Sequence, residues 1–69
     1  MTTKERITDA ALTLFSERGY TGTSVKNIAD AVGIRDASLY KHFKSKQEIF
    51  DSIVELINAH ISGISAELG

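Results

Sequence analysis

Residues 24–43, SVKNIADAVGIRDASLYKHF, contain two short amphipathic segments on either side of a glycine. The first segment repeats apolar side chains at the spacing of one helical face, at Val25, Ile28, Ala29 and Val32. The second carries Leu39 and Phe43 at the i, i+4 spacing, and Asp36 stands where it can cap that helix. Gly33, between them, can take the positive φ that a tight turn between two helices requires. The stretch therefore predicts a helix-turn-helix, with helices over about 25–32 and about 36–43.

Side chains near the crossing of these two helices have the sizes that such a motif needs. Ala29 is small where the helices must approach closely, while Ile34 and Leu39 are apolar where the second helix packs on the first. The remaining side chains of the second helix can then face outward, as a helix that enters the major groove of DNA requires. They include Arg35, Ala37, Ser38, Lys41 and His42.

The residues before this stretch predict another helix, over about 3–18. Its apolar side chains follow the i, i+3, i+4, i+7, i+8 pattern at Ile7, Ala10, Ala11, Leu14 and Phe15. Thr2 with Glu5 matches a capping box, and Gly19 after Arg18 predicts a left-handed residue at the helix end. Tyr20 lies where a hydrophobic side chain often folds back on the helix that it follows.

After the helix-turn-helix, Ser45 and Glu48 match a further capping box, and apolar residues then recur to the end of the sequence. At about 1.5 Å per residue, a helix from Lys46 to Glu67 would be roughly 32 Å long. The three shorter helices cannot cover that length, so Ile57, Ile61 and Ile64 should form an unpaired apolar stripe, which is typical of an interface. We therefore expect either that the chain continues in a longer protein or that this helix dimerises.

The expected fold is all-α: a three-helix, homeodomain-like helix-turn-helix bundle over residues 1–47, and a long connecting helix over 48–69. The 69 residues contain no Cys and no Pro, which excludes disulfides and thiolate metal sites. The first residues have no apolar h-region behind their charges, so we expect no signal peptide there, and no apolar run reaches the roughly 18 residues of a membrane span. We expect a soluble, intracellular domain with no cofactor and no membrane partner.

The net charge of −1 conceals a segregation of charge along the chain. Between Thr23 and Lys46 there are five Lys and Arg residues and two Asp residues, a net charge of +3. The rest of the sequence has three Lys and Arg residues and seven Asp and Glu residues, a net charge of −4. Local potential guides association more than the total charge does, so the central segment has the basic character expected of a nucleic-acid contact.

The same residues resemble the signature of the TetR family of repressors. The resemblance rests on Ile28-Ala29, Val32-Gly33, Ser38-Leu39-Tyr40-Lys41-His42-Phe43 and Lys46-Gln47-Glu48-Ile49-Phe50, and on the segment from Ala11 to Ser24. It implies a bacterial, cytoplasmic, nucleoid-associated transcriptional regulator that binds a pseudo-palindromic operator in double-stranded DNA as a homodimer. It also implies a C-terminal domain, absent from these residues, that dimerises and binds a small-molecule effector; effector binding would move the long helix and release the DNA.

Residue roles follow from the resemblance. Thr23 and Ser24 should meet a phosphate at the start of a helix, with Lys26 as a second phosphate contact. The candidates for base edges or flanking phosphates are Arg35, Asp36, Ala37, Ser38, Lys41 and His42. Lys46 matches a recurrent phosphate-contacting lysine. Three roles of Asp36 stay open, since it could cap the helix, accept from a cytosine amine or pair with Arg35. Tyr40 could contact phosphate or pack in the core.

Two other classes of function compete with DNA binding. The chain has no nucleophile elbow, metal-ligand cluster or phosphate-binding glycine loop, so we expect no catalytic residue and no enzyme. A helical protein-interaction module could use the apolar stripe instead. Such a module has no reason to gather cations between Lys26 and Lys46, so the charge pattern favours DNA.

Overall fold

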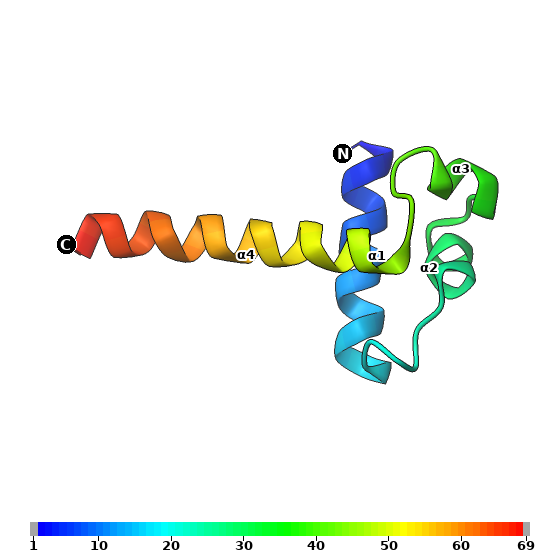
Figure 1. The fold of residues 1–69 in the computed structure, drawn as a ribbon, viewed down its shortest axis with the longest axis horizontal. Coiled ribbons are helices and arrows are strands. Elements are labelled where there is room, and N and C mark those ends of the chain that lie inside the picture. Colours follow the sequence, from blue (N-terminus) through cyan, green and yellow to red (C-terminus); the bar gives the residue numbers. More distant parts are fainter. Residues whose placement is uncertain (1, 69) are drawn as a thin grey trace.

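The computed structural model describes the backbone of residues 2–68 and the side chains of residues 2–59. The described chain is helical throughout, with connecting turns (Figure 1). Its four helices are α1 (Thr3–Arg18), α2 (Val25–Val32), α3 (Asp36–Tyr40) and α4 (Lys46–Leu68). Helix α1 packs against both α2 and α4, and α2 packs against α3. The expected all-α helix-turn-helix bundle with a long fourth helix is confirmed.

Both ends of α1 are fixed by the residues that the sequence indicated, although one of them differs in conformation. The Thr2 hydroxyl accepts from the amide of Glu5, and the Glu5 carboxylate accepts from the amide of Thr2, which completes a capping box. Gly19 ends the helix at φ 79° and ψ 165°, outside the left-handed helical region that we expected. This extended glycine turns the chain away from α1, while its amide still donates to the carbonyl of Phe15.

Helix α2 is capped at both ends. At its start, Ser24 and Asn27 form a reciprocal capping box, with bonds of 3.0 Å in each direction. At its end, Gly33 takes the left-handed conformation at φ 85° and ψ 30°, as the sequence predicts. The Arg6 guanidinium of α1 donates to the carbonyl of Val32 at 2.9 Å, so a neighbouring helix satisfies the last turn of α2.

Helix α3 is shorter than the expected 36–43 and ends at Tyr40. Beyond it the backbone tightens, because the amides of Lys41 and His42 donate to carbonyls only three residues earlier. The expectation that Asp36 caps this helix is wrong: the cap position belongs to Arg35, with no side-chain capping bond, and Asp36 lies in the first turn.

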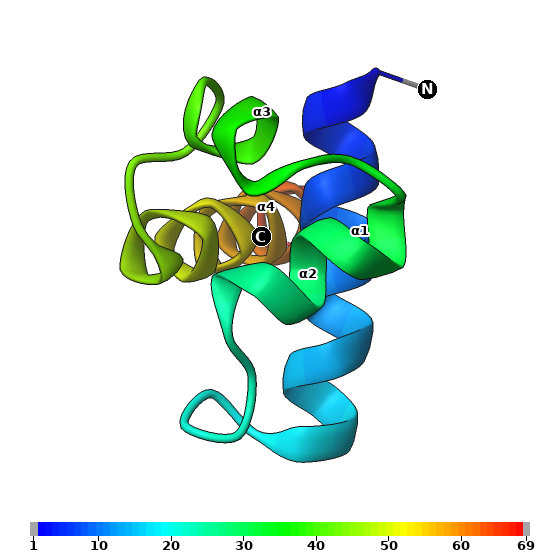
Figure 2. The same ribbon diagram turned by 90° about the vertical axis from the view of Figure 1, so that its right-hand side faces the viewer.

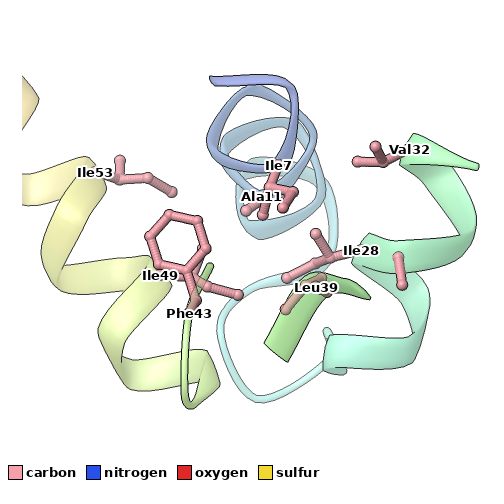
Figure 3. Packing of buried hydrophobic residues seen from close by; sticks show 9 residues of the cluster. Ile7, Ala11, Ile28, Val32, Leu39, Phe43, Ile49 and Ile53 are labelled. Atoms are coloured by element: carbon pink, nitrogen blue, oxygen red, sulfur yellow. The ribbon is translucent and has the colours of Figure 1, made fainter. Parts of the chain in front are cut away.

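All four helices contribute to one apolar core (Figure 3). Its buried members are Ile7, Ala11, Ile28, Ala29, Val32, Leu39, Phe43, Ile49 and Ile53. Ile49 and Ile53 lie in the first two turns of α4, so the packed domain continues past the expected boundary after Gln47. The start of α4 thus closes the core against α1.

Beyond Ile53, α4 projects from the body of the molecule and forms one end of its 44 Å long axis (Figure 1). Ile57 is 46% exposed, and Val54 and Leu56 are also exposed, which confirms the beginning of the uncovered apolar stripe. Ile61 and Ile64, the other expected members, lie outside the described side chains. In the part of the chain that the structure describes, no helix has the length and apolar character to cross a membrane.

Candidate nucleic-acid interface

Helices α2 and α3 lie together on the side of the molecule that faces the viewer in Figure 2, opposite the far end of α4. Leu39 is fully buried and anchors α3 on the core. Because a helix turns about 100° per residue, Ala37 and Lys41 lie on the side opposite Leu39 and project outward. The other exposed candidates around this helix are Arg35, Asp36, Tyr40 and His42, while Ser38 is half-buried. The structure thus gathers these predicted residues around α3, with all of them except Ser38 exposed.

Tyr40 projects outward rather than into the core. It is 48% exposed, whereas Phe43 is 2% exposed and belongs to the core. The alternative in which Tyr40 packs in the core is therefore excluded, and its ring and hydroxyl are available to a ligand of this face.

The start of α2 offers backbone donors to the same face. Of the amides in its first turn, those of Asn27 and Ile28 bond to Ser24. These two bonds leave the amides of Val25 and Lys26 unused. The side chains of Ser24 and Lys26 are exposed beside them. Free amides at a helix start favour an anion such as phosphate.

Thr23 does not reach this surface, contrary to its expected phosphate contact. It is 1% exposed, and its hydroxyl donates to the carbonyls of Leu14 and Gly19 at 3.2 and 2.9 Å. A hydroxyl just before a helix can either cap that helix or form a hydrogen bond inside the molecule. The path of the loop decides which of the two it does. Thr23 therefore acts inside the molecule, where it ties the α1–α2 loop to the end of α1.

Lys46 is also occupied within the molecule. Its ammonium donates to the carbonyls of Tyr20 and Thr23 at 2.7 and 2.9 Å, and it lies 4.1 Å from the centre of the Tyr20 ring. These partners are backbone atoms more than 20 residues away in sequence. Sequence reasoning had no signal for them and assigned the lysine to phosphate.

Asn27 is a residue of the site that sequence reasoning missed. Its side-chain carbonyl accepts from the amide of Ser24, which fixes the backbone where α2 begins. The Ser24-x-x-Asn27 spacing was the available signal, since an amide can replace the usual Glu or Gln of a capping box.

The charge on this face is suited to a polyanion. Lys26, Arg35 and Lys41 are exposed here, with Asp30 and Asp36 as the exposed carboxylates of the same segment. A short exposed helix beside a helix start with free amides can bind phosphates on a duplex and reach base edges between them.

Among the described residues there is no group of three side chains that could hold a metal ion. A hollow of about 220 Å³ between α1 and α2 is lined by Arg6, Asp9, Ala10, Ala31 and Val32.

Comparison with known proteins agrees with this geometry. Residues 7–53, more than half of the chain, match the family model described as bacterial regulatory proteins, tetR family. The chain is 46% identical over 61 residues to the biofilm operon icaADBC HTH-type negative transcriptional regulator IcaR of Staphylococcus aureus (strain Newman), and covers 33% of that protein. It is 50% identical over 52 residues to IcaR of Staphylococcus epidermidis, covering 75% of this chain and 28% of the relative.

A solved structure shows the same fold. The crystal structure of the probable transcriptional regulatory protein RHA5900 superposes with a TM-score of 0.82 at 43% identity, over 87% of this chain and 32% of the other. The chain therefore spans about a third of the length of the relatives that it matches. It belongs to the TetR family of bacterial regulatory proteins, as the N-terminal DNA-binding domain of that family.

Proposed function

We propose that this domain directs a transcriptional repressor to a specific DNA sequence. The observation that carries the proposal is the outward face of α3 beside the exposed start of α2, in the segment from Thr23 to Lys46, whose net charge is +3. IcaR is a negative transcriptional regulator, and its similarity to this chain supports repression rather than activation. The family assignment gives no support to the alternative of a helical interaction module.

In this proposal α3 lies in the major groove. Ala37 and Ser38 meet base edges, where the Ala37 methyl suits a thymine methyl, and Arg35 can pair with guanine. Asp36 is available to a cytosine amine or to Arg35, since it does not cap the helix. Phosphates on either side are bound by the start of α2, with Ser24 and Lys26, and by Tyr40, Lys41 and His42.

The relatives are longer than this chain. What the whole protein does is therefore also part of the proposal. We infer a homodimer, because two heads related by a two-fold axis fit a pseudo-palindromic operator. We also infer a small-molecule effector site outside this domain, whose occupation releases the DNA. The protein acts in the bacterial cytoplasm, bound to the nucleoid, and is not an enzyme.

The proposal is tested by the salt dependence of binding to a fluorescent duplex, measured by anisotropy. The 69-residue chain should bind at low salt and lose affinity steadily as salt is added. Lys26→Ala should weaken binding to all duplexes alike and lower the slope of log K against log[salt] by about 0.9, because one phosphate contact is lost.

Arg18→Ala is the matched control, since it removes one exposed positive charge of α1 that is not among the proposed contacts. Its slope should equal that of the wild type. Binding of the wild type that is absent at low salt, or insensitive to salt, would contradict a phosphate-contacting face.

A further inference from the structure

The α1–α2 loop and the first turn of α4 meet in a cluster of contacts that the DNA-binding role does not by itself explain. Lys46, the first residue of α4, donates two hydrogen bonds to this loop, to the carbonyls of Tyr20 and Thr23. Its ammonium lies 4.1 Å from the centre of the Tyr20 ring, where a cation–π interaction adds to both bonds. Two of its three N–H donors are thus directed at the protein rather than at solvent.

Tyr20 is itself fixed between α1 and α4. Its ring centre lies 5.5 Å from that of Phe15 in α1 and 5.3 Å from that of Phe50 in α4. Phe15 and Phe50 are also in contact, at 5.8 Å. The Tyr20 hydroxyl donates to the side-chain carbonyl of Gln47 at 3.0 Å. The residue that receives Lys46 therefore cannot move without disturbing both helices.

The loop leads directly from this cluster to the start of α2. A side chain at Gly22 would overlap the carbonyl of Arg18, so the loop runs against the end of α1. Thr23 then places its hydroxyl inside, and Ser24 follows as the exposed cap of α2. The carbonyl that Lys46 holds on Thr23 is bonded directly to the amide nitrogen of Ser24. Its position thus sets where α2 presents its free amides.

We propose that Lys46 is a positioning residue for DNA binding, which holds the α1–α2 loop and so fixes the start of α2, rather than a residue that contacts phosphate. This inference rests on the proposed function of the α2–α3 face. A lysine at a helix start opposes the helix dipole and needs compensation, and two carbonyls and an aromatic ring supply it inside the molecule.

The test replaces Lys46 with Met, which keeps the length of the side chain and removes its charge and donors. The free variant should show shifted amide resonances at Thr21 and Ser24, the residues that follow the two released carbonyls. Its affinity for a duplex should fall about tenfold, which is about 1.4 kcal/mol, because the start of α2 is no longer held where it meets phosphate. The salt slope should stay at the wild-type value, since no phosphate contact is removed.

Two further variants make the result specific. Lys44→Met removes a neighbouring exposed cation and should leave the resonances of Thr21 and Ser24 unchanged. Lys46→Gln retains donors for the two carbonyls without a charge, and should recover part of the affinity that Lys46→Met loses. If Lys46→Met does not fold, Lys46→Gln is compared with the wild type instead.

A fall of about 0.9 in the salt slope of Lys46→Met, with unshifted loop resonances, would overturn the positioning role and assign Lys46 to phosphate. Equal affinities of Lys46→Gln and Lys46→Met would also overturn it. A wild-type chain that binds no duplex would overturn the proposed function instead, and the positioning role with it.

Discussion

Leu39 and Phe43 decide which side of α3 meets a ligand. Both are buried, at 0% and 2% exposure, and they turn the opposite side of this short helix outward. Ala37 lies near the middle of that outward side, flanked by the half-buried Ser38 and the exposed Tyr40. Small side chains at this point let the helix backbone come close to base edges, so their identity should affect which bases are accepted.

Sequence preference should therefore change when these small side chains change. We expect Ala37→Ser and Ser38→Ala each to alter the bases selected from a pool of random duplexes at one or two positions, by about 1–3 kcal/mol per position. Ala31→Ser, at an exposed alanine of α2, is the matched control and should leave the selected sequence unchanged. If both α3 variants select the wild-type sequence, α3 does not read bases at these positions.

At the scale of elements, the turn between α2 and α3 depends on Gly33. Its φ of 85° is in the left-handed region, and a Cβ added there would meet no atom within 4 Å. The requirement for glycine is thus one of backbone conformation and not of space. The turn sets the angle at which α3 leaves the core, and so the orientation of the whole interface.

Gly33→Ala should destabilise the domain by about 1–2 kcal/mol, the cost of a left-handed residue that carries a Cβ. Gly33→Asn should cost less, because asparagine tolerates this conformation better. Urea unfolding followed by circular dichroism measures both. An alanine variant as stable as the wild type would show that the turn does not require a left-handed residue.

The elements were predictable from sequence where local chemistry determines them. Periodic apolar residues located α1 and α2, and Thr2 with Glu5 located the start of α1. Reasoning failed where a partner is distant in sequence: the carbonyls that receive Lys46, and those that receive the Thr23 hydroxyl. It also failed at the end of α3, where tightened backbone bonds keep Phe43 in the core without a continuous helix. The outward face was predictable because Leu39 and Phe43 are apolar at a helical spacing.

At the scale of the whole molecule, α4 has two parts with different roles. Its first two turns close the core through Ile49 and Ile53, and its remainder extends along the 44 Å axis away from α2 and α3 (Figure 1). Because α4 is one continuous helix, a displacement of its far part would reach the domain through the buried part. The junction with Tyr20 and Lys46 lies at the start of α4, where such a displacement would reach the loop before α2.

The two parts of α4 should respond differently to the same substitution. Ile49→Val should destabilise the domain by about 0.5–1.5 kcal/mol, since Ile49 is fully buried. Ile57→Val should change the free energy of unfolding by less than about 0.5 kcal/mol, because Ile57 is 46% exposed. Thermal and urea unfolding of both variants test this division. Equal effects would mean that the domain does not end near Ile53.

Binding of DNA by the face formed by α2 and α3 can be observed residue by residue in an NMR titration of the labelled 69-residue chain with a generic duplex at low salt. We expect amide shifts that concentrate at Ser24, Val25 and Lys26 and over residues 35–42, and that disappear as salt is added. A folded chain with no shifts, or with shifts confined to the exposed residues of α4 beyond Ile53, would contradict it.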